Sequence, residues 1–292
     1  MQKIKHFPVL LKECLSFFKD VNLNTFFDGT VGAAGHAKAI LDEHDEIEIY
    51  IGNDRDKDAL EIANDTLKPY MNKVRLVHSN YSNIDEILGD MNIKKVDGVL
   101  LDLGLSSMQL DSESRGFSFR YDSVLDMRMN KSQDLMAKDI VNKYSEKELY
   151  KIFKEYGEDR RSKVAAKEIV IQRKKKKINT TFDLLEVLMP VLNKNQRIHP
   201  ATRLFQALRI CVNDELGELK KGLSSAINRL NIDGVIGVIS FHSLEDRIVK
   251  HTFKDNKNLK VLTKKPIIAS RGERNPRARS AKLRFAKRVD NE

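Results

Sequence analysis

A glycine-rich turn at residues 28–36 is the segment of this chain best suited to hold a ligand. It reads Asp-Gly-Thr-Val-Gly-Ala-Ala-Gly-His and leads from a β-rich run into a helical one. Glycines allow close approach to the backbone, and the first turn of the following helix offers free N–H groups. The spacing Gly-x-x-Gly-x-x-Gly differs from the Gly-x-Gly-x-x-Gly of dinucleotide-binding enzymes, so a pyrophosphate is not the expected ligand. A glycine turn without a ligand is the simple alternative.

Carboxylates follow at the ends of the predicted strands. Asp54 comes nineteen residues after Gly35 and can accept hydrogen bonds from both hydroxyls of an unphosphorylated ribose. Asp56 competes for that role, and spacing does not separate the two. Asp102 ends another β-rich run, and Asp28 ends the first. Three acids at three strand ends suit a cationic nucleoside, and S-adenosylmethionine, with its sulfonium charge and free ribose, fits that description.

A parallel sheet is the framework that can position these groups. Between residues 24 and 104, short β-rich runs alternate with helical stretches, which is typical of βαβ units. Strands are predicted at residues 25–28, 47–53, 74–79 and 96–103, and helices at 36–41, 59–67 and 84–88. Right-handed crossovers then give a doubly wound α/β sheet. After the middle of the chain, strands are predicted at 235–241, 259–263 and 283–288, with a helix at 244–253.

The middle of the chain predicts a helical insert. After about residue 109 the signals become helical, and Ser145 and Glu148 have capping-box spacing for a helix that begins at Ser145. Further helices are predicted at 163–172, 181–192 and 201–230, the last interrupted near Gly217 or Gly222. We therefore expect a discontinuous sheet domain at residues 1–110 and 212–292 and a helical insert domain at 111–211.

Composition narrows the class of protein. The chain has 292 residues, of which 41% are hydrophobic and 32% charged, so it can bury a sizeable core and is not intrinsically disordered. No apolar run approaches the roughly 18 residues of a membrane span, and residues 1–11 lack a signal-peptide core. Cys14 and Cys211 are too few for a disulfide framework and lack metal-ligand spacing. We expect a cytoplasmic protein with no metal and no membrane partner.

Positive charge is concentrated in two segments of a chain whose formal net charge is +10. Residues 264–288 hold ten basic residues against one acid, and residues 160–177 hold nine against one. Such clusters neutralise phosphates and predict a nucleic-acid partner, with a solvated helix face and a loose tail as the alternative. The Arg-, Pro- and Ser-containing composition of residues 270–280 predicts an extended basic arm at the C-terminal end rather than a helix.

Several long motifs carry a family resemblance. They read His-Phe-Pro-Val-Leu-Leu at 6–11, Leu-Asp-Leu-Gly-Leu-Ser-Ser-Met-Gln-Leu-Asp at 101–111, Arg-Gly-Phe-Ser-Phe at 115–119, Leu-Asp-Met-Arg-Met at 125–129, Ala-Thr-Arg-Leu-Phe-Gln-Ala-Leu-Arg at 201–209 and Ile-Ser-Phe-His-Ser-Leu-Glu-Asp-Arg at 239–247. In these motifs and in the turn, over nearly its whole length, the chain resembles the family of ribosomal RNA small subunit methyltransferase H. These bacterial enzymes methylate N4 of a cytidine in the decoding region of 16S rRNA.

The resemblance implies a class I S-adenosylmethionine-dependent methyltransferase, with a Rossmann-like doubly wound sheet and a helical insert that recognises RNA. Its substrate would be 16S rRNA within the small ribosomal subunit. The cofactor contacts that the resemblance implies are Ala34, Gly35, His36, Asp54, Tyr81, Asp102 and Gln109. The family often has Gly at position 34 and Phe at position 81. Alanine is tolerated there if its φ is negative, and tyrosine keeps the aromatic face.

Asp102 is the candidate catalytic residue. An exocyclic cytosine amine is a poor nucleophile because its lone pair is shared with the ring, and an acceptor for its N–H proton localises that pair. The Asp/Asn-Pro-Pro-Tyr/Phe motif of many amino-methyltransferases is absent, and Asp-Leu-Gly-Leu-Ser-Ser at 102–107 stands in its expected place. We hypothesise that Asp102, Ser106 or a nearby carbonyl accepts from the amine.

Other residues have weaker claims to chemistry. His36 and His242 show no carboxylate partner in the sequence, so a structural role is expected for each. Methylation at C5 of cytosine would need a cysteine nucleophile, but Cys14 and Cys211 sit in apolar patterns that favour packing.

The insert also offers candidates for RNA contact. Its aromatic candidates for base stacking are Phe117, Phe119 and Tyr121, flanked by Arg115 and Arg120, with a small insert core as the alternative. Three other functions stay open: a DNA amino-methyltransferase, an RNA-binding protein without catalysis, and a nicotinamide-dependent oxidoreductase, whose glycine spacing is missing here.

Overall fold

The structure is a computed structural model that describes residues 8–193, 198–270 and 275–290. His6 and Phe7 of the first motif, and Arg271 and Arg274 of the expected arm, lie outside these residues. The chain divides into two compact units. We name them the sheet unit, Met1–Gly104 with Leu216–Glu292, and the helical unit, Leu105–Glu215. The boundaries lie six and four residues from the expected ones, at 104 rather than 110 and at 215 rather than 211.

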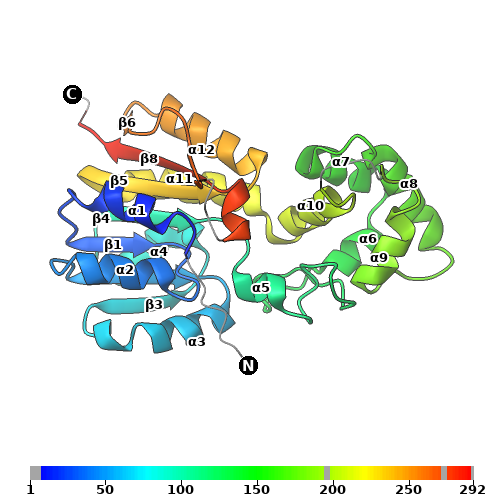
Figure 1. Ribbon diagram of the computed structural model, residues 1–292, viewed down its shortest axis with the longest axis horizontal. Coiled ribbons are helices and arrows are strands. Elements are labelled where there is room, and N and C mark those ends of the chain that lie inside the picture. Colours follow the sequence, from blue (N-terminus) through cyan, green and yellow to red (C-terminus); the bar gives the residue numbers. More distant parts are fainter. Residues whose placement is uncertain (1–7, 194–197, 271–274, 291–292) are drawn as a thin grey trace. The chain divides into compact units, whose positions relative to one another are not determined.

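The sheet unit is built on one mixed sheet with strand order β3-β2-β1-β4-β5-β8-β6, and β7 pairs with β8 (Figure 1). Strands β1 to β5 are parallel to one another, and β8 runs antiparallel to β5, β6 and β7. The doubly wound α/β class expected from the sequence is therefore confirmed. The strands are β1 (Thr25–Asp28), β2 (Ile49–Asp54), β3 (Val74–His78), β4 (Val96–Asp102), β5 (Leu230–Ser240), β6 (Leu259–Val261), β7 (Ile267–Ile268) and β8 (Lys282–Arg288).

Helices cover both faces of this sheet. Successive strand residues alternate between the two buried apolar clusters that lie under these helices. Phe26, Tyr50 and Leu100 lie in one buried cluster, while their neighbours Phe27 and Ile51 lie in the other. Successive strand residues point to opposite faces, so nearly continuous apolar runs are what a doubly covered parallel sheet requires. The first face carries α1 (Leu11–Phe18), α2 (Gly35–Glu43) and α3 (Lys57–Thr66), and the second carries α4 (Ile84–Asp90), α11 (Glu215–Arg229) and α12 (Ser243–Asp255).

Two predicted boundaries are wrong. The helix expected at 201–230 is two helices, α10 (Thr202–Asn213) and α11, and the break falls at Asp214 rather than near Gly217 or Gly222. Asp214 adopts φ 45°, a left-handed cap that ends α10. Gly222 instead lies inside α11, against the ring of Tyr81. Strand β5 begins at Leu230, five residues before the predicted start.

The expected C-terminal arm is largely part of the fold. Residues Pro276–Ser280 form a 3-10 helix, not an extended segment, because Ala278 and Ala281 are buried in the core of the sheet unit. Residues Lys282–Arg288 form β8 between β5 and β6. Several of the arm's cations are therefore committed to partners inside the sheet unit.

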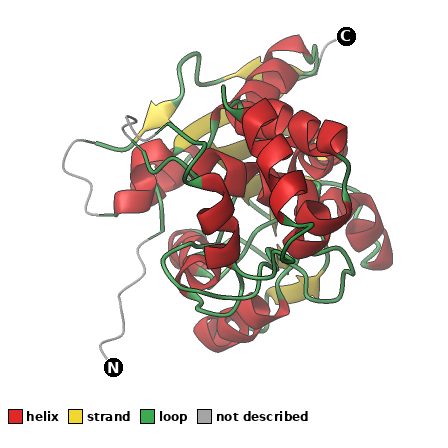
Figure 2. Cartoon of the chain, turned by 90° about the vertical axis from the view of Figure 1, so that its right-hand side faces the viewer, coloured by secondary structure: helices red, strands yellow, loops and turns green. Residues whose placement is uncertain are grey.

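The helical unit consists of short helices and loops around its own core (Figure 2). Ser145 is the N-cap of α7 (Glu146–Gly157), as predicted, and forms a capping box with Glu148. The segment between α5 (Ser107–Asp111) and α6 (Ala137–Lys143) is fixed by side-chain hydrogen bonds. The Asn213 side chain donates to Met127 O and accepts from the Met129 N–H. The helices are α5 (Ser107–Asp111), α6 (Ala137–Lys143), α7 (Glu146–Gly157), α8 (Ser162–Gln172), α9 (Thr181–Leu188) and α10.

Within the described residues, the helices are too short or too polar to span a bilayer.

Gly222 allows us to test how α11 docks on the sheet. A Cβ at Gly222 would lie 2.6 Å from both Cδ2 and Cε2 of Tyr81, whereas a Cβ at Gly89 in α4 would meet nothing within 4 Å. We expect Gly89→Ala to stabilise the protein by up to about 1 kcal/mol through helix propensity. Gly222→Ala should destabilise it by about 1–3 kcal/mol because overpacking outweighs that gain. Urea unfolding measures both, and equal effects of the two substitutions would contradict the packing described.

Candidate active site

Three carboxyl groups meet at one edge of the sheet. Asp28, Asp54 and Asp102 are the last residues of β1, β2 and β4. These strands are parallel, and β1 lies between β2 and β4, so their carboxyl ends share an edge. In open parallel sheets this edge, where the strand order reverses, is the usual place for a ligand.

The glycine-rich turn is tied to Asp54. The Gly32 N–H donates to Asp54 Oδ2 at 2.9 Å, and the Asp56 N–H donates to Oδ1 at 2.8 Å. The Asp56 side chain instead caps α3 by accepting from the Asp58 N–H. The structure thus separates the two candidates for the ribose: Asp54 faces the turn, and Asp56 serves a helix.

Ala34 departs from the expected backbone. Its φ is +65°, so the condition of a negative φ for tolerating alanine is not met. The left-handed region costs an L-residue roughly 1–2 kcal/mol, which is why glycine would suit this position. Ala34 is the N-cap of α2, where the chain must turn sharply from the strand edge into the helix, and its methyl group is fully buried.

Asp28 links the glycine-rich turn to β2 through two hydrogen bonds. Its Oδ1 accepts from the Thr30 N–H at 3.1 Å, and its Oδ2 accepts from the Tyr50 hydroxyl at 2.9 Å. Thr30 Oγ1 in turn accepts from the Asp102 N–H at 2.6 Å. Thr30 and Tyr50 were not predicted site residues, because their roles depend on strands that are distant in sequence.

Asp102 faces a histidine from the start of α2. His36 Nε2 lies 3.8 Å from Asp102 Oδ2. The expectation that His36 has no carboxylate partner is therefore wrong, since the pairing crosses from α2 to β4. Asp102 Oδ1 has no hydrogen-bond partner among the described residues, although the atom is buried. A carboxyl with an unused buried oxygen can accept a hydrogen bond from an N–H or O–H group of a ligand.

The three carboxyls hold their protons unusually well. Removal from water, together with the charges of Asp28 and Glu245, raises the pKa of Asp102 to about 8. Burial raises the pKa of Asp28 to about 7 and that of Asp54 to about 6. Burial in low dielectric disfavours the charged form of a carboxyl. Clustered carboxyls with raised pKa values mark this edge as a functional-site candidate.

The first turn of α12 adds a buried acid that the sequence did not single out. Glu245 is 2% exposed, and its Oε2 accepts from the backbone N–H groups of Phe241 and His242. His242 Nε2 lies 3.2 Å from Glu245 Oε1, so the expectation that His242 lacks a carboxylate partner is also wrong. His242 is the N-cap of α12 and forms a capping box with Glu245, and only the fold places that cap close enough to act on Asp102.

The remaining predicted contacts are placed as follows. Tyr81 is 8% exposed and packs near the turn, since a Cβ at Gly29 would lie 2.8 Å from Tyr81 Cβ. Gly35 opens α2. Gln109 belongs to the helical unit, where it closes the capping box of α5 with Ser106. Ser106 Oγ accepts the Gln109 N–H at 3.2 Å, so its first role is as a helix cap.

Neither cysteine has the properties of a nucleophile. Cys14 is fully buried in the core of the sheet unit, and burial raises its pKa well above the usual value. Burial also raises the pKa of Cys211 to about 11. Both thiols are protonated near neutral pH and so lack the activated state that attack at C5 of cytosine requires.

The helical unit revises the expected RNA contacts. Phe117 lies in its core, and Phe119 stacks on His199 at 4.4 Å between ring centroids. Arg115 is 7% exposed and donates to the carbonyls of residues 128 and 129. Phe117, Phe119 and Arg115 therefore stabilise the helical unit, which confirms the alternative of a small insert core for them. Of the three aromatic residues, Tyr121 alone is exposed.

Some of the arm's cations are likewise internal. Arg284 and Lys282 pair with Asp246 at 2.7 and 3.0 Å. Burial alone would raise the pKa of Asp246, but hydrogen bonds from these two cations hold it below its usual value. Lys264, Lys265 and Arg279 are exposed.

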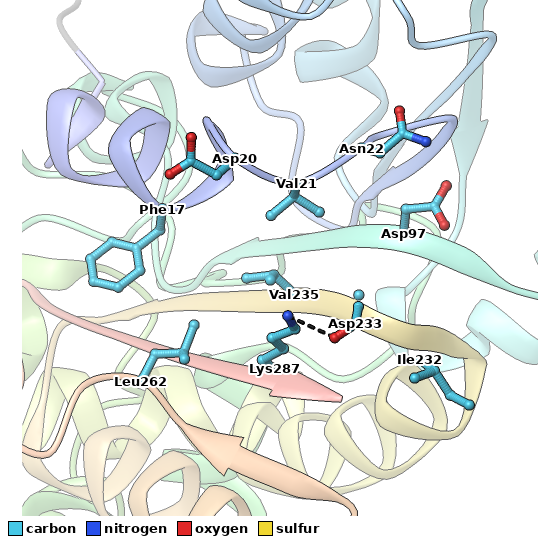
Figure 3. A pocket seen from close by; sticks show the side chains of 11 residues that line it. Phe17, Asp20, Val21, Asn22, Asp97, Ile232, Asp233, Val235, Leu262 and Lys287 are labelled. Atoms are coloured by element: carbon cyan, nitrogen blue, oxygen red, sulfur yellow. Dashed lines mark ion pairs between the residues drawn. The ribbon is translucent and has the colours of Figure 1, made fainter. Parts of the chain in front are cut away.

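A separate pocket of about 390 Å³ lies at the opposite edge of the sheet (Figure 3). Asp97, near the start of β4, lines it and accepts from the N–H groups of Asn24 and Thr25. The Lys287–Asp233 ion pair crosses it at 2.7 Å. Asp97, Asp233 and Lys287 thus have partners within the chain.

Comparison with known proteins agrees with this geometry. The MraW methylase family matches residues 3–289. A ribosomal RNA small subunit methyltransferase H from Persephonella marina is 47% identical over 98% of this chain and all of its own length. One from Clostridioides difficile is 44% identical over 97% of this chain and 99% of its own. A crystal structure of an rRNA methylase from Streptococcus thermophilus aligns over 98% of this chain and 99% of its own, with 8% identity and a TM-score of 0.48.

The residues at the carboxyl edge fit a sulfonium nucleoside. Asp54 can accept from ribose hydroxyls, and the negative potential of Asp28 and Asp102 suits a cation. The unused Oδ1 of Asp102, among the described residues, is a buried acceptor that a ligand or substrate donor would satisfy.

The raised pKa values predict a pH-dependent affinity for the cofactor. A bound cation favours ionised carboxyls, so S-adenosylmethionine should bind more tightly as pH rises from about 6 to about 8, with proton release. In the free protein the folded state holds these protons better than the unfolded chain does, so its stability should fall over the same range. Calorimetric titration in buffers of different ionisation enthalpy measures the released protons.

S-adenosylhomocysteine, which lacks the sulfonium charge, is the matched control. Its affinity should depend less on pH. Identical pH profiles for the two nucleosides would show that the carboxyls do not respond to the sulfonium.

Proposed function

The chain belongs to the MraW methylase family, and from that premise we propose that it transfers the methyl group of S-adenosylmethionine to N4 of a cytidine in 16S rRNA. We further propose that it acts in the cytoplasm on the small ribosomal subunit, as the names of its relatives suggest. That the protein is an S-adenosylmethionine-dependent methyltransferase follows from the family; the base, the atom and the assembly state of the RNA are the proposal.

One observation favours an acceptor that loses a proton, an amine or a hydroxyl, over C5 of cytosine. Asp102 presents an oxygen without a hydrogen-bond partner among the described residues, on a carboxyl whose pKa is about 8. Such a carboxylate is a stronger base than an ordinary aspartate, and a general base works best when its pKa lies near the working pH. Hydroxyl or amine acceptors need this help, whereas C5 of cytosine needs a thiolate, which the chain does not provide.

The reaction then proceeds as a displacement. Bound S-adenosylmethionine supplies an electrophilic methyl group on a positively charged sulfur. Asp102 accepts a hydrogen bond from the amine, which localises the nitrogen lone pair. Asp102 would accept the amine proton as the methyl group passes to the nitrogen, with the neutral thioether of S-adenosylhomocysteine as the leaving group. Asp102 would keep this proton, because the positive charge that favours its ionised form would then be gone.

Other residues position these groups. Thr30 accepts from the Asp102 backbone, which fixes the end of β4. His36 lies 3.8 Å from Asp102 Oδ2 and orients the carboxyl. We propose that Asp54 holds the ribose, that the backbone at Ala34 and Gly35 approaches the cofactor, and that Tyr81 and Gln109 complete its site. Alignment of this kind supplies much of the rate enhancement in a displacement.

A basic stripe on α8 supports an RNA substrate. Lys163 and Lys167 lie one turn apart on α8 and are exposed, and the exposed Arg160 and Lys174 lie just beyond its two ends. Like charges at this spacing destabilise a helix by about 0.2–0.5 kcal/mol per pair. The nearby acid Glu168 accepts a hydrogen bond from Gln172. A polyanion would relieve this repulsion by pairing with the lysines.

The decisive experiment offers labelled S-adenosylmethionine with unmethylated small subunits, naked 16S rRNA and duplex DNA, followed by nucleoside analysis. We expect N4-methylcytidine from a ribosomal substrate and none from DNA. Transfer to DNA would favour a DNA amino-methyltransferase. Cofactor binding without transfer to any of the three would refute the proposed function.

Asp102→Asn tests the proposed base in the same assay. Loss of general-base help should lower kcat by about 100-fold or more, while S-adenosylhomocysteine binding changes little. In the wild type, kcat/KM should rise with pH with a midpoint near 8, the pKa of Asp102 in the free enzyme, and the variant should lose that dependence. Full turnover by the variant would remove Asp102 from the chemistry.

The α8 stripe is tested by Lys163→Gln/Lys167→Gln. Removing two phosphate contacts should reduce the slope of log affinity for RNA against log salt by about 1.5. Lys147→Gln/Lys151→Gln on α7 is the matched control, because these lysines are exposed, equally spaced and followed by Glu155. Equal slopes for the two double variants would exclude α8 from the RNA contact.

A further inference from the structure

Two aromatic side chains of the helical unit are left exposed. Tyr121 is 43% exposed and Phe182 is 46% exposed. Every other Phe or Tyr side chain within the ranges that the structure describes is buried or half-buried. Burial of an aromatic ring is among the larger apolar gains available to a chain. A fold that uses its other rings in this way, yet leaves two exposed, suggests that a partner covers them.

The two rings lie on segments that are fastened side by side. Thr180 pairs with Val124 in an antiparallel bridge, and Thr181 Oγ1 donates to Tyr121 O at 2.7 Å. The Phe182 N–H donates to Asp122 Oδ1 at 3.2 Å. Val124, between the segments, is itself 50% exposed. We name Tyr121, Val124 and Phe182 the aromatic patch.

Cations surround the aromatic patch. Arg120 precedes Tyr121, and the exposed lysines 174–177 precede the segment that carries Phe182. The neighbouring acids Asp122 and Asp183 are engaged, since each accepts backbone N–H groups and Asp183 also pairs with Lys176 at 2.6 Å. Glu186 is the other nearby acid and is exposed. Five cations against three acids leave the rim of the patch positive.

We propose that the aromatic patch stacks unpaired bases of RNA, with Arg120 and the lysines at 174–177 binding the phosphates beside them. This deepens the proposed function, on which it rests, by assigning the helical unit a contact with single-stranded nucleotides. Rings flanked by cations are how proteins hold single strands, because every base offers a π-face. A duplex keeps those faces stacked inside, so it cannot use the patch.

The absence of tryptophan from the sequence makes a direct test available. Phe182→Trp, and separately Tyr121→Trp, introduces a single tryptophan whose fluorescence a stacked base quenches. Titration with a short single-stranded oligoadenylate RNA should quench both variants and leave their affinity within about 3-fold of wild type. Glu155→Trp, exposed on α7, is the control and should stay unquenched.

Truncation distinguishes stacking from simple apolar contact. Phe182→Ala and Tyr121→Ala should each weaken oligoadenylate binding about 5-fold or more. Phe182→Leu keeps apolar area without a π-face and should bind as poorly as Phe182→Ala. Wild-type affinity for Phe182→Leu would mean that the patch makes an apolar contact of the kind a peptide makes, and would overturn the proposal.

The outcomes separate this inference from the proposed function. Oligoadenylate binding without quenching of either tryptophan would refute stacking, even if the enzyme methylates small subunits normally. Quenching together with a failure to methylate any RNA would leave the patch as a single-strand contact and refute the proposed reaction.

Discussion

The placement of three carboxyl groups at one edge of a parallel sheet is the constraint on which the site depends. Asp28, Asp54 and Asp102 reach this edge because they end neighbouring parallel strands. Their removal from water raises all three pKa values, so the free protein holds protons on these carboxyl groups rather than burying their charges. A cationic cofactor would displace those protons, and in the proposed reaction Asp102 takes up a new proton from the substrate amine as the cofactor loses its charge. Binding and catalysis thus draw on the same electrostatic arrangement.

Two apolar cores, one on each face of the sheet, hold the strands that carry these carboxyl groups. Alternate residues of β1 and β2 enter two separate cores, each covered by helices. The glycine-rich turn is then fixed by hydrogen bonds to residues from three strands: Gly32 to Asp54, Thr30 to Asp28, and Asp102 to Thr30. The positive φ of Ala34 is a local strain that these contacts hold in place.

The two units divide the work of methylating an RNA. The sheet unit supplies the carboxyl edge, and its C-terminal cations at 282 and 284 mainly hold Asp246. The helical unit offers exposed lysines on α8 and an aromatic patch with a positive rim. Phosphate contacts set register and salt dependence, whereas base contacts discriminate between single and double strands. The proposed stacking surface would therefore add selectivity for unpaired RNA to an otherwise electrostatic attraction.

The sequence by itself determined the fold class, the order of strands along the chain, the helical insert and the acids that end β1, β2 and β4. These follow from local apolar periodicity and from short motifs, which do not depend on distant residues. The tertiary structure decided that Asp54 rather than Asp56 faces the turn, that His36 lies beside Asp102, and that Ala34 is left-handed. It also moved the break between α10 and α11 to Asp214, formed a 3-10 helix at Pro276–Ser280 where the sequence predicted an extended arm, and exchanged Phe117 and Phe119 for Phe182 as an exposed ring. Burial, backbone φ and side-chain partners arise from segments far apart in sequence, so local patterns cannot specify them.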